Sequence, residues 1–185
     1  MIVLYNPLST TPGKQPLPLS LMALAAVLEA SEPWTLVDGN LVPDPAAEII
    51  ARLSDVSGTL TPLLAVSVMP GPQLTQAVAV CARVKAALPH VPIVWGGYFP
   101  TQHYDVILKS GYVDYVVRGQ GEDALLELVQ HIESRSAPDL IAGIGFKRDG
   151  KMIILNANCL DKDWTKHEKA LTGILDGIKV GTPKK

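Results

Sequence analysis

The sequence predicts an α/β fold: a doubly wound, five-stranded parallel sheet of the flavodoxin or Rossmann-like type, followed by a small C-terminal β-hairpin and a polar tail. Short apolar runs alternate with longer segments whose apolar residues recur every three or four positions. This alternation is typical of a parallel sheet covered by helices on both faces. Of the 185 residues, 48% are hydrophobic and 18% are charged, which is enough to form a sizeable core.

The chain opens with two strand–helix units. The first strand is expected at residues 2–5, and a helix with regularly spaced apolar positions follows at residues 16–30. The second strand is expected at residues 34–37, directly before the turn signal Asp38-Gly39. The helix after it, at residues 46–53, follows a proline, which suits the first turn of a helix.

Two further units follow. A strand is expected at residues 63–68, with a helix at residues 73–88 whose apolar face includes Cys81, so this thiol is expected in the core. The next strand, residues 92–95, leads into a helix that Thr101 is expected to cap and that runs to about residue 110.

The last unit pairs a strand at residues 113–117 with a helix at residues 122–132. The pattern then changes to a β-hairpin with strands at residues 144–146 and 152–155 around an Asp-Gly turn, and a further helix is expected at residues 164–178. The expected parts are a binding domain at residues 1–140, a hairpin extension at 141–155 and a polar tail or linker at 156–185.

Composition excludes several classes of protein. The formal net charge is −2, so there is no excess of basic residues to hold a nucleic acid backbone. No apolar run approaches the ~20 residues that a membrane span needs. The two cysteines, Cys81 and Cys159, form neither a disulfide framework nor a four-thiolate metal site by themselves. We therefore expect a cytoplasmic protein without a membrane or nucleic acid partner, and the uncharged start reads as a strand rather than a leader.

Four loops should lie together at the carboxyl edge of the sheet, where open α/β folds bind their ligands. These loops are small, polar or rich in glycine, and a buried strand that ends in Gly96-Gly97 lets a broad ligand approach the backbone. The simpler interpretation is that each glycine only turns the chain into its helix. The four loops are residues 6–10, 67–71, 96–98 and 118–122.

The motifs in these loops resemble those of the cobalamin-binding domain at the N-terminus of cobalamin-dependent radical SAM enzymes. Ser67-Val68-Met69 is similar to the family's Ser-x-Leu, and residues 96–101, Gly-Gly-Tyr-Phe-Pro-Thr, are similar to its Gly-Gly-x-His-Pro-Thr. Residues 115–122 resemble its Asp-x-Val-Val-x-Gly-Glu-Gly-Glu, with Gln120 in place of a glutamate. The resemblance extends over about residues 1–155, from the Asn-Pro after the first strand to the hairpin.

The resemblance implies a site for the cofactor cobalamin, whose corrin ring would lie across the carboxyl edge while its dimethylbenzimidazole tail passes between the strands. Ser67 would contact the tail, Gly96 and Gly97 would let it pass, and Met69 and Tyr98 would pack on the rim of the ring. Thr101 and residues 119–122 would bind the tail or the corrin amides. The candidate site residues are Asn6, Pro7, Ser67, Met69, Pro70, Gly71, Gly96, Gly97, Tyr98, Thr101, Gly119, Gln120, Gly121 and Glu122.

Two of these residues also have an ordinary structural explanation. For Ser67 it is a strand-end hydroxyl that is satisfied within the protein, and for Glu122 it is a carboxylate that favours the N-terminal dipole of its helix. We predict no catalytic residue and no metal ligand in this chain.

The absence of two motifs narrows the expected cobalamin chemistry. No Asp-x-His-x-x-Gly string is present, so the histidine that binds cobalt in cobalamin mutases has no counterpart, and His103, nearest the glycine pair, is expected to be exposed. The resemblance therefore implies methylcobalamin or hydroxocobalamin bound base-off without a histidine ligand. No Cys-x-x-x-Cys-x-x-Cys string is present either, so an iron–sulfur cluster and SAM would belong to a radical SAM domain in cis or in trans that carries out methyl transfer.

Two alternatives stay open. One is a stand-alone corrinoid carrier, and the other is a flavodoxin-like module that binds a flavin or a nucleotide. Against the second, the first loop has neither Gly-x-x-x-x-Gly-Lys nor Gly-x-Gly-x-x-Gly. A phosphorylation receiver would need acidic residues where Asn6-Pro7 and Ser67 stand, and a hydrolase of the Gly-x-Ser-x-Gly type is excluded by the absence of that motif.

Overall fold

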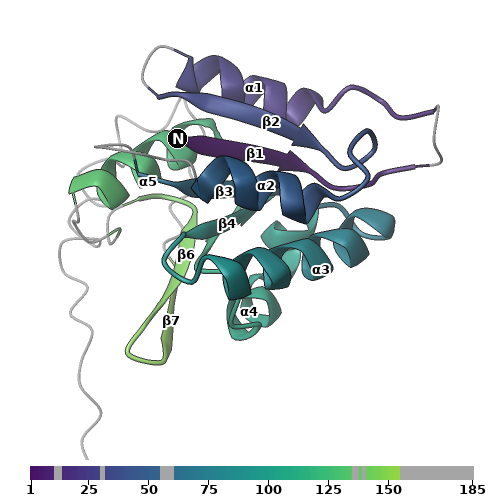
Figure 1. Cartoon of the computed structure of the whole chain (residues 1–185). Helices are drawn as coiled ribbons and strands as arrows, with labels where there is room; N and C mark the ends of the chain where they lie inside the picture. The colour runs from purple at the N-terminus through teal and green to yellow at the C-terminus, as the bar shows by residue number, and fades with distance from the viewer. Residues whose placement is uncertain (11–13, 30–31, 55–60, 135–137, 139–140, 155–185) are drawn as a thin grey trace, which may run out of the picture.

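The computed structural model describes residues 1–10, 14–29, 32–54, 61–134, 138 and 141–154. Within these described residues, five strands alternate with five helices and two further strands follow, as the sequence predicts (Figure 1). Their bounds are β1 Ile2–Asn6, α1 Leu19–Leu28, β2 Trp34–Asp38, α2 Pro45–Ser54, β3 Leu63–Ser67, α3 Pro72–Ala87, β4 Ile93–Gly96, α4 Tyr98–Lys109, β5 Tyr115–Val117, α5 Glu122–Ser134, β6 Ile144–Arg148 and β7 Lys151–Ile154. The expected helix at 164–178, Cys159, and the rest of the tail at 156–185 lie outside the described residues.

The strands form one sheet in the order β2-β1-β3-β4-β5-β6-β7. The first five strands are parallel, which confirms the doubly wound arrangement and its flavodoxin-like order. The hairpin adds two antiparallel strands to the edge of this sheet, so the sheet has seven strands rather than the five expected. Its turn uses Asp149 and Gly150, both with positive φ, as a two-residue Asp-Gly hairpin requires.

Two hydrophobic layers enclose the sheet. On one face, β-strand residues such as Val66 and Trp95 pack under α2, α3 and α4. On the other face, Ala65, Val94 and Val117 pack under α1 and α5. Figure 1 shows α1 on the opposite side of the sheet from α2 and α3. Successive strand residues thus serve opposite cores, as a doubly covered parallel sheet demands.

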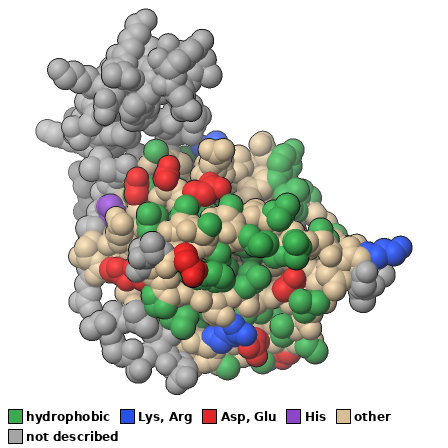
Figure 2. All heavy atoms as spheres, turned by 90° about the horizontal axis from the view of Figure 1, so that it is seen from above, with side chains coloured by type: hydrophobic (Ala, Val, Ile, Leu, Met, Phe, Trp, Pro, Cys, Tyr) green, Lys and Arg blue, Asp and Glu red, His purple; other side chains and the backbone are tan. Residues whose placement is uncertain are grey.

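Helix α1 begins three residues later than expected, at Leu19 instead of residue 16. The reason is local. A proline disfavours a helical conformation for the residue before it, so the helix does not extend back past Pro18, which stands at the N-cap. The helix carries no charged residue, and Leu19 and Met22 on it are exposed. Figure 2 views the molecule from the α1 side and shows hydrophobic side chains gathered over much of this face, with acidic ones among them.

Helix α4 begins earlier than expected. It starts at Tyr98 with Gly97 as its N-cap, so the prediction that Thr101 caps this helix is wrong. Pro100 fits inside the first turn because the backbone N–H groups there have no partner within the helix. A kink at His103, with φ −124° and ψ 33°, separates this short start from the rest of α4. Among the described residues, no helix is long and apolar enough to cross a membrane.

Candidate functional site

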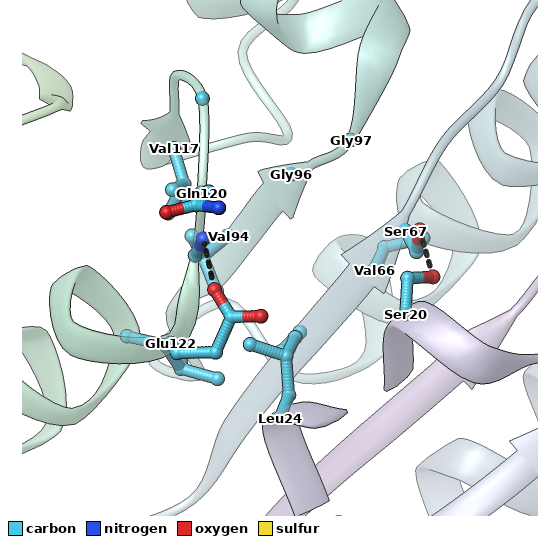
Figure 3. A pocket seen from close by; sticks show the side chains of 14 residues that line it. Ser20, Leu24, Val66, Ser67, Val94, Gly96, Gly97, Val117, Gln120 and Glu122 are labelled. Carbon is cyan, nitrogen blue, oxygen red and sulfur yellow. Dashed lines mark hydrogen bonds between the residues drawn. The ribbon is translucent and has the colours of Figure 1, made fainter. Parts of the chain in front are cut away.

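A pocket of about 220 Å³ opens between α1 and α5 at the carboxyl ends of β3, β4 and β5 (Figure 3). It is smaller than the roughly 300–1,000 Å³ of pockets for drug-sized ligands, so it suits one ring system rather than a whole corrinoid. Its lining residues are Ser20, Leu24, Ala65, Val66, Ser67, Val94, Gly96, Gly97, Val117, Gly119, Gln120, Gly121, Glu122 and Leu125.

The sheet register arranges these residues in two layers. Ser67 pairs with Gly96 at the mouth, and two residues earlier on the same strands Ala65 pairs with Val94. The layers are about 6.6 Å apart because a parallel strand rises about 3.3 Å per residue. Helix α1 repeats the pattern, because Leu24 follows Ser20, the residue of α1 at the mouth, by one helical turn. The upper layer therefore combines Ser67 and Gly96 with the alkyl side chain of Val117, which lies level with Gly96, and the lower layer is built of alkyl side chains.

The two glycines at the end of β4 have different functions. Gly97 has φ +100° and ψ −167°, a conformation open almost only to glycine, and a Cβ atom there would lie 3.1 Å from both N and O of Val68. Gly96 does not have a positive φ, and a Cβ atom on it would meet only the Cβ of Val117, at 3.7 Å. Gly97 is therefore required by the backbone, whereas Gly96 leaves room in the pocket.

The hydroxyl of Ser67 faces α1 at the mouth. Its Oγ lies 3.2 Å from Oγ of Ser20, within hydrogen-bonding distance, and the two serines stand side by side in Figure 3. Ser20 is the only polar residue of α1. A pair of hydroxyls that bond each other has one hydrogen left over, so the pair can still donate one hydrogen bond to a ligand.

The loop between β5 and α5 forms the opposite wall. Oε2 of Glu122 accepts a hydrogen bond from the backbone N of Gly121 at 3.0 Å, and its carboxylate points into the pocket beside Leu24 (Figure 3). Gln120 is exposed at the mouth. A Cβ atom on Gly121 would lie 3.5 Å from Cδ2 of Leu24, so this glycine brings the loop close to α1. Glu122 therefore lines the pocket and holds its own loop.

Thr101 connects the two glycine-rich loops. Its hydroxyl donates to the carbonyl O of Gly97 at 2.8 Å and accepts from the backbone N of Gly119 at 3.0 Å. Arg118, next to this loop, stacks on the ring of Tyr104 at 4.5 Å from its centroid. The only hydrogen of the Thr101 hydroxyl is therefore bound within the protein. Thr101 is not among the pocket-lining residues, and its contacts position the loops that are.

Asn6 and Pro7 lie away from the pocket. Both are buried, and Oδ1 of Asn6 accepts a bond from Nε2 of Gln73, whose Oε1 in turn accepts from the backbone N of Met69. The side-chain amide of Asn6 donates to Asp38 at 3.1 Å. This network ties the ends of β1 and β2 to the loop after β3, so the amide of Asn6 is satisfied within the protein.

The remaining candidates lie at the rim. Met69 and Tyr98 are 47% and 59% exposed and do not line the pocket. Pro70 is exposed, and Gly71 is the N-cap of α3 with φ +91°. The structure thus brings Ser67, Gly96, Gly97 and residues 119–122 together in the pocket. It places Asn6, Pro7, Thr101 and the four rim residues outside its lining.

The helices supply pocket residues that sequence reasoning missed: Ser20, Leu24 and Leu125. One signal for Ser20 was available, because a lone polar residue stands in the first turn of an otherwise apolar helix that follows the first strand. Leu24 and Leu125 gave no such signal, since a leucine at helical spacing reads as core.

The one cysteine in the part of the chain that the structure describes is buried in the core, away from the pocket. Burial raises the pKa of the Cys81 thiol to about 12, and Nε1 of Trp95 donates to its Sγ at 3.2 Å. No group of three or more metal-ligating side chains lies among the described residues. His103 is exposed, as expected, and stacks on Phe99 with ring centroids 4.7 Å apart.

Comparison with known proteins agrees with this geometry. The family model of the B12 binding domain matches residues 5–129. The chain is 31% identical over 151 residues to an anaerobic magnesium-protoporphyrin IX monomethyl ester cyclase from a Synechocystis species, a match that covers 78% of this chain and 29% of that protein. The chain therefore spans less than a third of the length of that relative.

Solved structures share the fold. TsrM from Kitasatospora setae, a radical S-adenosylmethionine methyltransferase solved with cobalamin and a 4Fe–4S cluster, matches with a TM-score of 0.71 at 18% identity over 86% of this chain and 29% of its own. OxsB, a cobalamin-dependent S-adenosylmethionine radical enzyme solved with aqua-cobalamin and S-adenosylmethionine, matches with a TM-score of 0.71 at 19% identity over 88% of this chain and 23% of its own. From the family match and the shared fold, the chain belongs to the B12 binding domain family, in a form similar to the cobalamin-binding regions of radical SAM enzymes.

Proposed function

We propose that this chain binds cobalamin base-off, with the nucleotide tail in the pocket between α1 and α5 and the corrin ring across the carboxyl edge of the sheet. The observation that carries the proposal is a ring-sized pocket whose mouth is bare at Gly96 and whose floor is apolar. A flat aromatic base fits such a space, and a Cβ atom at Gly96 would point into it.

The residues that would hold the tail follow from the two layers. Ser67, supported by Ser20, has a hydroxyl at the mouth that can contact the base or ribose. Gln120 and the backbone of residues 119–121 line the opposite wall and can bind the phosphate or corrin amides. The segment directly after β1, residues 7–10, contains no histidine, which supports binding without a protein histidine ligand to cobalt.

The rim favours a further domain over a stand-alone carrier. Met69 and Tyr98 are exposed apolar side chains at the carboxyl edge, and a corrin ring with a domain above it would cover them. When bound, cobalamin supplies a cobalt centre that can carry a methyl group. We propose that residues 1–140 serve a radical SAM domain, in cis or in trans, which binds SAM and an iron–sulfur cluster and carries out methyl transfer.

The test is a visible-absorption titration of the purified chain with hydroxocobalamin and methylcobalamin, followed by desalting. We expect retained corrinoid with a base-off spectrum in the wild type and loss of retention in Gly96→Leu, which places a side chain in the pocket. Leu41→Gly, at a 67% exposed leucine outside the pocket lining, is the control. A wild type that retains no corrinoid, or retains it base-on, would contradict the proposal.

A further inference from the structure

We propose that the pocket selects among corrinoids by their lower base, taking those with an apolar benzimidazole over those with adenine. The inference rests on the proposed function, because it concerns the same pocket and adds the chemical class of ligand. The part of the pocket that makes the choice is its lower layer, formed by Ala65 and Val94 on the sheet and by Leu24 and Leu125 on the helices.

The lower layer offers no free hydrogen-bonding group. Ala65 and Val94 are 4% and 2% exposed and face each other across the sheet register. Their backbone groups belong to the parallel ladder between β3 and β4, so these groups are already paired. Leu24 and Leu125 close this level from the two helices with alkyl side chains.

The polar side chains of the pocket come from its mouth, and the carboxylate of Glu122 points inward beside Leu24 (Figure 3). The hydroxyls of Ser20 and Ser67 bond each other, and the carboxylate of Glu122 accepts from the backbone N of Gly121. Gln120 is exposed at the mouth. The serine hydroxyls and Gln120 meet the part of a ligand nearest the solvent, which in a nucleotide tail is the phosphate and the ribose, whereas the carboxylate of Glu122 offers an acceptor deeper in the pocket.

The two kinds of lower base differ at their far edge. Each base is joined to the ribose through one ring nitrogen. The far edge of dimethylbenzimidazole is a benzene ring with two methyl groups, whereas the far edge of adenine carries ring nitrogens and an amino group. With the layers about 6.6 Å apart, the far edge of an inserted bicyclic base reaches the lower layer. The ring nitrogens of adenine would lose their hydrogen bonds to water there without gaining others, because the carboxylate of Glu122 can accept from the amino group but has no hydrogen to donate to them.

The experiment compares three probes on the intact chain: hydroxocobalamin, the cobamide whose lower base is adenine, and cobinamide, which lacks the nucleotide tail. Dissociation constants are measured by absorption titration and retention after desalting. We expect cobalamin to bind roughly tenfold or more tightly than the adenine cobamide, and cobinamide to bind weakly. Leu24→Gln, which places an amide in the lower layer, should bring the dissociation constants of the two cobamides closer together.

A matched control is Leu17→Gln. It makes the same change at a leucine that is 72% exposed and does not line the pocket, and it should leave the ratio unchanged. Far-UV circular dichroism checks that both variants fold. Equal affinity of the wild type for the two cobamides, with weak binding of cobinamide, would overturn the inference while the proposed function stands. Cobinamide binding as tightly as cobalamin would show that the tail is outside the pocket and overturn both, as would a wild type that binds none of the probes.

Discussion

The contrast between Gly96 and Gly97 gives a prediction that separates folding from binding. Gly97→Ala forces a Cβ atom into a backbone conformation that costs a non-glycine residue about 1–3 kcal/mol. The new atom would also lie 3.1 Å from N and O of Val68, which cannot move freely because Val68 N bonds the carbonyl of Gly96 at 2.8 Å. A loss of about 2 kcal/mol lowers the melting temperature of a domain of this size by roughly 4–8 °C.

Gly96→Ala should behave in the opposite way. Its φ is ordinary and the nearest atom to the new Cβ is 3.7 Å away, so the melting temperature should stay within about 2 °C of the wild type or rise slightly, since alanine restricts the unfolded chain. Gly96→Leu should also fold, because its side chain enters a pocket with an apolar floor. It should nevertheless lose roughly tenfold or more in cobalamin affinity, because it takes the space of the tail.

The assay is thermal unfolding followed by circular dichroism without corrinoid, and then the absorption titration on the same samples. Equal melting temperatures for Gly97→Ala and Gly96→Ala would refute the argument that Gly97 is held by the backbone. Wild-type affinity in Gly96→Leu would refute the argument that Gly96 keeps the pocket open.

Three further predictions concern stability. Burial raises the pKa of the Cys81 thiol from 9.0 to about 12, so the unfolded chain loses this proton at a lower pH than the folded chain. The free energy of unfolding therefore falls as pH rises above 9, by about 1.4 kcal/mol at pH 10. Cys81→Ala should reduce this fall when the melting temperature is measured against pH. Asp114→Ala should cost about 1–3 kcal/mol in urea unfolding because it removes the carboxylate that pairs with Lys85 at 2.8 Å and accepts from the backbone N of Ile93 at 2.7 Å. Asp105→Ala, which breaks an exposed pair, should cost under about 0.5 kcal/mol, and equal costs would contradict the assignment. Thr101→Val should cost about 1 kcal/mol and weaken cobalamin retention, with both restored in Thr101→Ser; an unchanged Thr101→Val would show that the loops are positioned without this hydroxyl.

The alternation of strands and helices could be predicted from the sequence, because each element has its own local periodicity of apolar residues. The mouth of the pocket was also predictable in part: Ser67 and Gly96 end neighbouring parallel strands and pair in register, so any parallel sheet with β3 beside β4 brings them together. The hairpin was predicted from its Asp-Gly turn. Its pairing with β5 could not be, since register between distant segments depends on packing rather than on local sequence.

The floor of the pocket was beyond sequence reasoning for a geometric reason. Leu24 and Leu125 come from helices that are far apart in the chain, and they meet only because α1 and α5 cover the same face of the sheet. That pairing depends on the strand order and on which way each crossover runs. A leucine that lines a pocket and a leucine that fills a core have the same spacing, so periodicity cannot distinguish them.

Side chains bridge the carboxyl edge of the sheet at Asn6, whereas the same edge is hollow at the pocket. At the end of β1, side-chain amides bridge to β2 and to the loop after β3, and the buried amide of Gln73 completes the link. At the ends of β3 to β5 the corresponding positions carry Ser67, Gly96 and the glycines of the last loop, which leave space instead of filling it. A bound tail would therefore enter beside a carboxyl edge already held rigid by its own hydrogen bonds. In the proposed complex, the polar residues at β1 would contribute to binding through the position of the loop at Met69, and not through contact with the tail.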